Sequence, residues 1–403
     1  MTDRLKTLSV PLVRLSAIIG QIVYVKIYSH HLSNYQLGIY FYLMTSSYFL
    51  NALIFVPMDY YQQSRVYPFR EAGISLTVFL RFNKSLLLVI GVITVLVMLP
   101  CLFVGRVVAM EAVVCAALSV TLYVTTAFKN LLNNLDHKLM VALIFLVEVV
   151  LKTGLFYAAM RVFPPQAIYL LGSNILALLI VLGLLILAAR RRRIFSDGSA
   201  HRVDYREAIQ FSYPLAIAAI ANWLQSQGYR LLLVPLGYTE MVGLYGVVSN
   251  VGVTAMSAVS VIFGQMYSPR LYQTQGGYLR TYLRHALLLV GFILLIGYAC
   301  SGFVVPLLTG HNRAPYSHLF VYGVGTEAGN FLAGALAIYM TIKNRTKVIM
   351  NSAFVGVLTV AVAVSIVYFA GRTSVFTIGL PIVFSQAAVV IYMLYAWQKP
   401  TSA

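Results

Sequence analysis

The sequence predicts an all-α polytopic membrane protein with twelve transmembrane helices. Hydrophobic residues make up 60% of the 403 residues and charged residues only 10%, whereas soluble domains carry about 25% charged residues. The chain also contains repeated apolar stretches of about 18 residues or more, the length that crosses a bilayer. A soluble fold cannot bury so much apolar surface, so the surrounding medium is expected to be lipid.

Twelve apolar stretches are long enough to be spans. The second, fourth and seventh are the most polar, so their ends are the least defined. A cleavable signal peptide is not expected, because the apolar stretch after Arg4 and Lys6 is too long for one. The predicted spans are 8–28, 36–57, 79–104, 107–128, 139–162, 167–189, 209–234, 241–266, 285–308, 317–341, 348–370 and 374–397.

The distribution of Lys and Arg predicts the orientation. With a cytoplasmic N-terminus, 21 of the 29 basic residues fall in cytoplasmic segments, 4 in external loops and 4 within spans. Positive residues concentrate on the cytoplasmic side of membrane proteins, so both termini are predicted to be cytoplasmic. The net charge of +18 is thereby explained by topology, and we expect no nucleic-acid partner.

The longest predicted cytoplasmic loop, residues 190–208, divides the chain near its midpoint. We therefore predict an N-terminal six-helix lobe, 1–196, and a C-terminal six-helix lobe, 197–403.

The two halves also show a weak internal repeat. Gly38-Ile39-Tyr40 matches Gly243-Leu244-Tyr245 at an offset of 205 residues, and Arg65-Val66-Tyr67 matches Arg270-Leu271-Tyr272 at the same offset. Both first helices start in the cytoplasm, so the repeats are parallel. Transporters built from such repeats bind substrate at the repeat interface.

Four basic residues lie within spans, where a charge costs roughly 2.5–3.5 kcal/mol and is a functional candidate by default. Arg14 shares a helix face with Gln21, and we expect Arg14 to face a cavity. Lys26 and Arg230 lie near the outer ends of their spans, where they either snorkel to the interface or line the same cavity. The predicted substrate-binding residues are Arg14, Lys26, Lys152 and Arg230, and the predicted polar lining is Gln21, Asn222, Ser226 and Asn330.

Two carboxylates lie deep in predicted spans, and both are candidates for proton coupling. Glu148 is four residues before Lys152, so the two can pair along one helix face. That pair either neutralises itself for insertion or places a substrate-binding cation beside a proton acceptor. Glu327 has no cation nearby in the sequence. It pairs across helices, stays protonated, or titrates during transport, and it is the better coupling candidate.

Motifs for catalysis, cofactors and metals are absent from the sequence. There is no GxxxxGKS or GxxxxGKT phosphate loop and no HExxH motif, and Cys101, Cys115 and Cys300 lack metal-ligand spacing. We therefore expect neither enzymatic activity nor a bound cofactor or metal. The predicted external loops are also too short for the catalytic loop of a multispan polymerase or glycosyltransferase.

The twelve helices, six plus six, resemble the multidrug/oligosaccharidyl-lipid/polysaccharide (MOP) exporter superfamily, and within it the bacterial O-antigen flippases of the Wzx type. Two segments carry the resemblance: Tyr24-Val25-Lys26-Ile27-Tyr28 through Gly38-Ile39-Tyr40, and Phe211-Ser212-Tyr213-Pro214 through Gly243-Leu244-Tyr245. They are similar to the opening helix pairs of that family. Drug-extruding relatives share the fold, so the fold alone does not choose the substrate.

The resemblance implies a V-shaped cationic cavity that binds an undecaprenyl-diphosphate-linked oligosaccharide at the bacterial cytoplasmic (inner) membrane. The lobes would release it outward by alternating access, with its tail remaining in the membrane lipid. Arg14 resembles first-helix arginines of related flippases for lipid-linked cell-wall precursors. Polysaccharide polymerase and chain-length proteins are the protein partners this implies. The alternative is a multidrug or small-solute antiporter of the same superfamily; an O-antigen polymerase is a weaker one.

Overall fold

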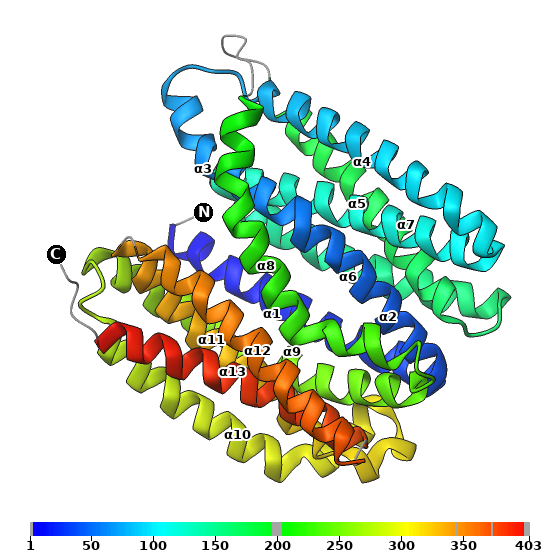
Figure 1. The fold of residues 1–403 in the computed structure, drawn as a ribbon. Helices are drawn as coiled ribbons and strands as arrows, with labels where there is room; N and C mark the ends of the chain where they lie inside the picture. Colours follow the sequence, from blue (N-terminus) through cyan, green and yellow to red (C-terminus); the bar gives the residue numbers. More distant parts are fainter. Residues whose placement is uncertain (1–2, 196–203, 344, 372–373, 399–403) are drawn as a thin grey trace. The chain divides into compact units, whose positions relative to one another are not determined.

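The computed structural model describes residues 3–195, 204–343, 345–371 and 374–398, and it is built from helices (Figure 1). The helices are α1 (Asp3–His31), α2 (Asn34–Leu50), the π-helical turn η1 (Asn51–Phe55), α3 (Val56–Glu71), α4 (Thr77–Val104), α5 (Arg106–Asn134), α6 (Lys138–Val162), α7 (Ala167–Arg191), α8 (Tyr205–Leu233), α9 (Thr239–Gln273), α10 (Leu279–Thr309), the 3₁₀ turn η2 (His311–Tyr316), α11 (Leu319–Ile342), α12 (Thr346–Phe369) and α13 (Val375–Gln398).

The helices follow the predicted spans in order, which confirms the all-α polytopic fold class. Within the described residues, ten helical segments are long and apolar enough to cross a membrane. The other two long helices, α8 and α11, have 29 and 24 residues. They carry three of the four predicted lining residues, Asn222 and Ser226 on α8 and Asn330 on α11, and these polar side chains lower their hydropathy. The orientation of the termini stays a prediction.

The second span is longer than predicted. It was expected to end at residue 57, where the polar stretch after Pro57 begins, but α2, η1 and α3 form one helical segment of 38 residues, Asn34–Glu71. In the π turn, the Val56 N–H donates to the Asn51 carbonyl, five residues back. Pro57 follows directly, at the start of α3, where its missing N–H is tolerated. The helix therefore continues past Pro57, and Asp59 lies within it.

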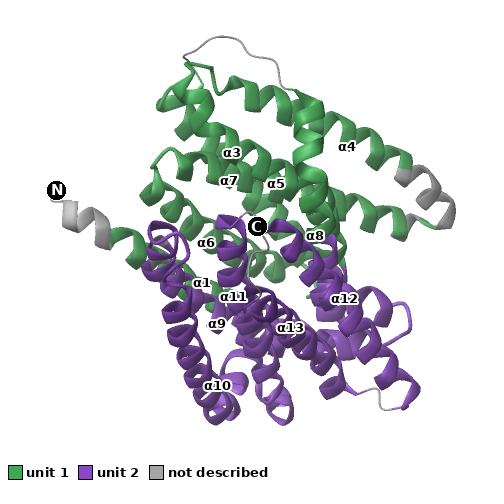
Figure 2. Ribbon diagram, turned by 60° about the vertical axis from the view of Figure 1, so that its left-hand side comes forward, with its two compact units in different colours: residues 1–24, 43–219 green, residues 25–42, 220–403 purple. Residues whose placement is uncertain are grey.

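The described chain forms two compact units (Figure 2). Unit 1 contains residues 1–24 and 43–219, and unit 2 contains residues 25–42 and 220–403. The end of α1 and the start of α2 thus belong with the helices of the second half. The predicted lobe boundary at residues 196 and 197 lies outside the described residues, and lobes 1–196 and 197–403 stay a prediction.

Unit 1 is organised around α5, which packs against α3, α4, α6 and α7. The start of α8 also belongs to this unit. There the Tyr205 ring stacks on Phe82 of α4, with ring centroids 5.9 Å apart, and the Ser212 hydroxyl donates to the Pro57 carbonyl at 3.1 Å. The first two turns of α8 therefore pack against α3 and α4.

Unit 2 is organised around α11, which packs against α9, α10, α12 and α13. The start of α2 crosses the start of α9 at two glycines. A methyl group on Gly38 would overlap the Thr239 carbonyl, and one on Gly243 would overlap the Asn34 carbonyl. Gly38 and Gly243 are 205 residues apart, and so are Asn34 and Thr239. The crossing is therefore nearly two-fold symmetric, at the offset of the repeat.

Candidate functional site

Glu148 of α6 lies between two lysines in unit 1. Its Oε1 accepts from the Lys152 ammonium at 2.6 Å, and its Oε2 contacts the Lys129 ammonium of α5. The Glu148 residue is only 4% exposed. The i, i+4 pair expected from the sequence is therefore present, together with a second lysine. One carboxylate and two ammonium groups leave this cluster with a net charge of +1.

Lys129 is a residue that sequence reasoning did not connect with Glu148. It was counted in a cytoplasmic loop because the fourth span was expected to end at residue 128. In the structure α5 continues to Asn134, so Lys129 stays inside the helix and reaches Glu148. Its ammonium also lies 5.6 Å from the centre of the Phe145 ring, an attractive cation–π contact.

The first part of α1 packs on α6 beside this cluster. A Cβ atom on Gly20 would lie 3.0 Å from the Val149 side chain, one residue after Glu148. The Tyr24 hydroxyl donates to Asn174 of α7 at 2.6 Å. Of the predicted site residues on α1, Gln21 follows Gly20 and is exposed. Arg14 is half-buried and lies six residues before Gly20, about 9 Å along the helix axis.

Lys26 has surroundings that match the snorkelling alternative. It is exposed and shares one helix face with the exposed apolar side chains of Leu15, Ile19 and Val23. A long lysine on an apolar face near a helix end can reach the membrane surface. Its role in substrate binding stays a prediction.

Arg230 of α8 lies against aromatic rings in unit 2. Its guanidinium carbon is 5.0 Å from the centre of the Phe41 ring on α2 and 5.3 Å from that of Tyr229. Arg230 Nε–H donates to the Tyr229 hydroxyl at 2.9 Å. On the same helix, Ser226 donates to the Asn222 carbonyl at 2.9 Å, and the Asn222 side chain is exposed.

Glu327 of α11 lies among neutral polar groups. Asn330 Nδ2 donates to its Oε2 at 3.3 Å, and Ser257 of α9 hydrogen-bonds the same carboxyl group. Among the described residues, no Lys, Arg or His lies within ion-pair distance of Glu327. The alternative of a cross-helix ion pair is therefore not seen, and the other two alternatives stay open.

The predicted site residues divide between the units. Arg14, Gln21, Glu148 and Lys152 belong to unit 1, and Lys26, Asn222, Ser226, Arg230, Glu327 and Asn330 belong to unit 2. Their assignment to one substrate site remains a prediction. In the described part of the chain, no group of three or more His, Cys, Asp or Glu side chains could hold a metal ion.

Arg313 of η2 is a buried residue that the sequence did not single out. It was counted as an external-loop cation, but only 2% of it is exposed. Its guanidinium donates to the Ser29 carbonyl at 2.8 Å, to the Thr309 carbonyl and to Asn34 Oδ1 at 2.9 Å. Carbonyls at helix C-termini lack partners within the helix, so Arg313 caps α1 and α10 together. Burial lowers the pKa of this guanidinium from its ordinary value.

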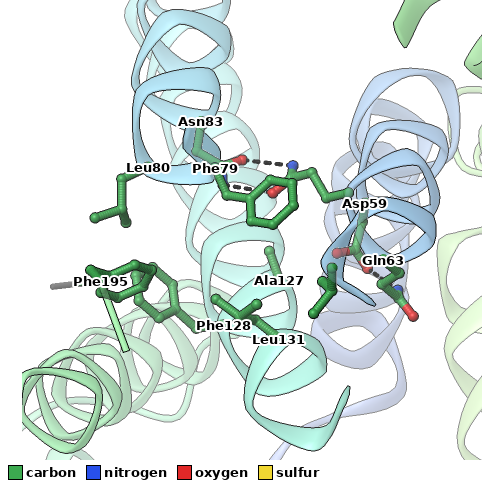
Figure 3. A pocket seen from close by; sticks show the side chains of 11 residues that line it. Asp59, Gln63, Phe79, Leu80, Asn83, Ala127, Phe128, Leu131 and Phe195 are labelled. Atoms are coloured by element: carbon green, nitrogen blue, oxygen red, sulfur yellow. Dashed lines mark hydrogen bonds between the residues drawn. The ribbon is translucent and has the colours of Figure 1, made fainter. Parts of the chain in front are cut away.

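Asp59 of α3 was also missed, because the second span was expected to end before it. In unit 1 it lines a small cavity with Gln62, Gln63 and Asn83 (Figure 3). Gln62 and Asn83 exchange two hydrogen bonds, of 3.0 and 2.9 Å. Gln62 also donates to the Tyr123 hydroxyl of α5 at 2.8 Å. A polar network therefore joins α3, α4 and α5.

The fold is similar to that of solved transporters of the MOP superfamily. No protein-family model and no curated protein sequence matches the chain, but solved structures do. An outward-facing MATE-family multidrug-resistance transporter of the MOP superfamily superimposes with a TM-score of 0.65 and 11% identity, covering 96% of this chain and 93% of that one.

Two further solved structures are similar over nearly the whole chain. The lipid II flippase MurJ, in an inward closed conformation, has a TM-score of 0.64 and 11% identity, covering 98% of this chain and 87% of that one. A MOP-superfamily transporter from Pyrococcus furiosus, described by the reverse polarity of its binding pocket, has a TM-score of 0.60 and 12% identity, covering 97% and 94%. At these identities the likeness establishes the fold alone.

Proposed function

We propose that the chain is a flippase that moves a polyprenyl-diphosphate-linked oligosaccharide across the bacterial cytoplasmic membrane by alternating access. The observation that carries this proposal is the net positive charge retained by the Lys129–Glu148–Lys152 cluster. A buried cluster with an excess cation attracts an anionic cargo. Arg14 of α1 adds a further cation in the same unit.

The cargo's charge also supplies a driving force. A lipid-linked diphosphate carries about two negative charges, and an inside-negative potential of about 100 mV favours the outward movement of each charge by about 2.3 kcal/mol. Export therefore needs no nucleotide hydrolysis by this chain. The undecaprenyl tail stays in the membrane lipid. Polysaccharide polymerase and chain-length proteins, which act on the released unit, are the partners proposed.

A multidrug or small-solute antiporter is the second candidate, and Glu327 favours it. A half-buried carboxylate hydrogen-bonded to neutral Asn330 would attract a cationic solute. The flippase is preferred because the Lys129–Glu148–Lys152 cluster keeps an excess cation and Arg230, which lies against aromatic rings, adds another.

The test is deletion of the gene in its host, followed by complementation. The flippase proposal expects surface polysaccharide to vanish while its lipid-linked unit accumulates in the inner leaflet. Wild type and the matched control Lys138→Ala, an exposed lysine at the start of α6, should restore export, whereas Arg14→Ala and Lys152→Ala should not. Arg14→Lys should retain part of it, because lysine keeps the charge but not the bidentate fork.

Two results would favour the antiporter instead. One is normal surface polysaccharide in the deletion strain together with increased accumulation of cationic dyes. The other is full export by both alanine variants, which would remove Arg14 and Lys152 from the substrate site.

A further inference from the structure

A polar cavity of about 340 Å³ lies in unit 2, where the end of α1 meets the starts of α2 and α9 and the turn η2. Cavities that bind small molecules commonly measure about 300–1,000 Å³. The segments that form it, 29–34, 240 and 309–313, all fall in predicted external loops, so the cavity belongs to the predicted outer face. Its polar lining includes His30, Ser33, Asn34, Glu240, Asn312 and Arg313.

Arg313 is a buried cation in the wall of this cavity. It is 2% exposed, and among the described residues no Asp or Glu lies within ion-pair distance of it. Neutral oxygens accept four hydrogen bonds from its guanidinium, which has five N–H groups. Its donors are therefore largely satisfied while its charge is not balanced. A buried charge in this condition is costly unless a counter-charge joins it.

Two neutral side chains of the cavity have their donor groups oriented by contacts on their other side. Asn34 Oδ1 accepts from Arg313 Nε–H at 2.9 Å, and because the amide is planar its Nδ2 group points away from that contact. Ser33 Oγ accepts from the Gln36 N–H at 3.3 Å, the N-cap bond of α2, so its hydroxyl proton remains to be donated. The cavity therefore offers an amide and a hydroxyl donor beside the arginine.

The carboxylate of the lining, Glu240, does not balance this arginine. It lies in the first turn of α9, where a carboxylate stabilises its own helix, and it is exposed. On the other side of the cavity, the charges of Lys26, His31 and Arg313 all act on the His30 ring. Two permanent cations, Lys26 and Arg313, thus oppose one exposed carboxylate.

We propose that this cavity binds a phosphate group. A phosphate supplies the counter-charge that Arg313 lacks, and its oxygens accept from N–H and O–H donors such as those of Asn34 and Ser33. The N-terminus of α2, which begins at Asn34, adds the positive end of a helix dipole. The phosphate comes either from solution or from the headgroup of a lipid in the predicted outer leaflet. The proposal does not rest on the identity of the transported cargo.

The test measures the unfolding midpoint of the purified full-length protein in a sugar-based detergent that contains no phosphate. A ligand that binds the folded state raises this midpoint. If free phosphate is the ligand, inorganic phosphate raises the midpoint above its value in chloride at equal ionic strength. If a lipid phosphate is the ligand, phosphatidic acid raises it above the value in diacylglycerol with the same acyl chains, and inorganic phosphate does not.

Asn34→Asp is the decisive variant. Aspartate keeps an oxygen that accepts from Arg313, but it replaces the amide donor and supplies the missing negative charge from the chain itself. The variant should therefore fold and lose the phosphate-dependent shift. The matched control is Asn351→Asp, at an exposed position of α12, which should keep the shift in full. Should Asn34→Asp not fold, Asn312→Asp, which adds a negative charge at an exposed position of the same cavity, should lose the shift.

Two results would overturn the proposal. One is a wild-type midpoint that responds neither to inorganic phosphate nor to phosphatidic acid. The other is a shift that Asn34→Asp retains in full, or Asn312→Asp if the first variant does not fold. Phosphate would then bind elsewhere, for example at the Lys129–Glu148–Lys152 cluster of unit 1.

Discussion

Three side chains, Lys129, Glu148 and Lys152, set the net charge of the cluster around Glu148. The sequence predicted only the contact between Glu148 and Lys152. Lys152 is four residues away on the same helix, so periodicity alone brings it to Glu148. Lys129 comes from α5 and is 19 residues away in sequence. Its arrival turns a neutral pair into a cluster of net charge +1, which is what an anionic cargo requires.

This cluster gives a prediction about stability. Glu148→Gln leaves two partly buried ammonium groups without a carboxylate and should destabilise the protein by up to about 3 kcal/mol, the lower end of the cost of breaking a buried pair. Lys129→Met leaves a neutral Glu148–Lys152 pair and should cost less. The double variant Lys129→Met/Glu148→Gln leaves one lysine and should be more stable than Glu148→Gln alone. Unfolding midpoints of the purified variants measure this order, and the reverse order would contradict the cluster.

Two helices of unit 2, α2 and α9, approach each other closely at their crossing. The contact depends on Gly38 and Gly243, each of which lies against a carbonyl of the other helix. Glycines allow backbones to approach this closely in membrane helix pairs. Arg313 adds further contacts nearby, because its guanidinium donates hydrogen bonds to the Ser29 carbonyl at the end of α1 and to the Asn34 side chain of α2.

The symmetry of this crossing predicts matched effects of substitution. Gly38→Ala and Gly243→Ala should each destabilise the protein by about 1–3 kcal/mol, the cost of overpacking, and by similar amounts. Gly91→Ala on α4, where no atom lies within 4 Å, should be neutral or stabilising by up to about 1 kcal/mol through helix propensity. Thermal unfolding in detergent measures all three. Tolerance of alanine at both crossing positions would show that the helices do not meet there.

The orientation of the whole molecule is predicted from the uneven distribution of basic residues. Cysteines at Gly105 and Pro164 should react with an impermeant thiol reagent added to intact cells, because both positions lie in predicted external loops. A cysteine at Ser199, outside the described residues, should react only after the cells are opened. Labelling at Ser199 in intact cells would reverse the predicted topology.

The transport cycle of the whole molecule is expected to depend on Glu327. Its carboxyl group has neutral hydrogen-bond partners, so a proton can bind in one conformation and leave in the other. In vesicles with an imposed pH gradient, wild type should transport faster than without it. Glu327→Gln, which mimics the protonated form, should bind cargo but not respond to the gradient. Equally fast wild-type transport without a gradient would exclude this role, leaving the membrane potential as the driving force.

Much of the fold could be predicted because a membrane-spanning helix is recognised from the hydropathy of consecutive residues, which the sequence gives directly. The twelve spans and the i, i+4 contact of Glu148 with Lys152 all follow from local pattern. The end of the second span could not be found this way. A π turn before Pro57 keeps the helix intact through a polar stretch, and hydropathy does not register that geometry.

Composition and hydropathy alone indicate that this protein lies in a membrane, that it is helical, and that its predicted spans carry more basic than acidic residues. The sequence also contained the 205-residue repeat that reappears at Gly38 and Gly243. Which charged side chains have a partner of opposite charge or a hydrogen-bonding partner depends on the folded structure. Lys129 reaches Glu148 from another helix, Arg313 is buried against helix ends, and Asp59 accepts hydrogen bonds from the amides of Gln63 and Asn130. Compensation depends on side chains brought together by helix packing, and contacts between residues distant in sequence leave no periodic signal along the chain.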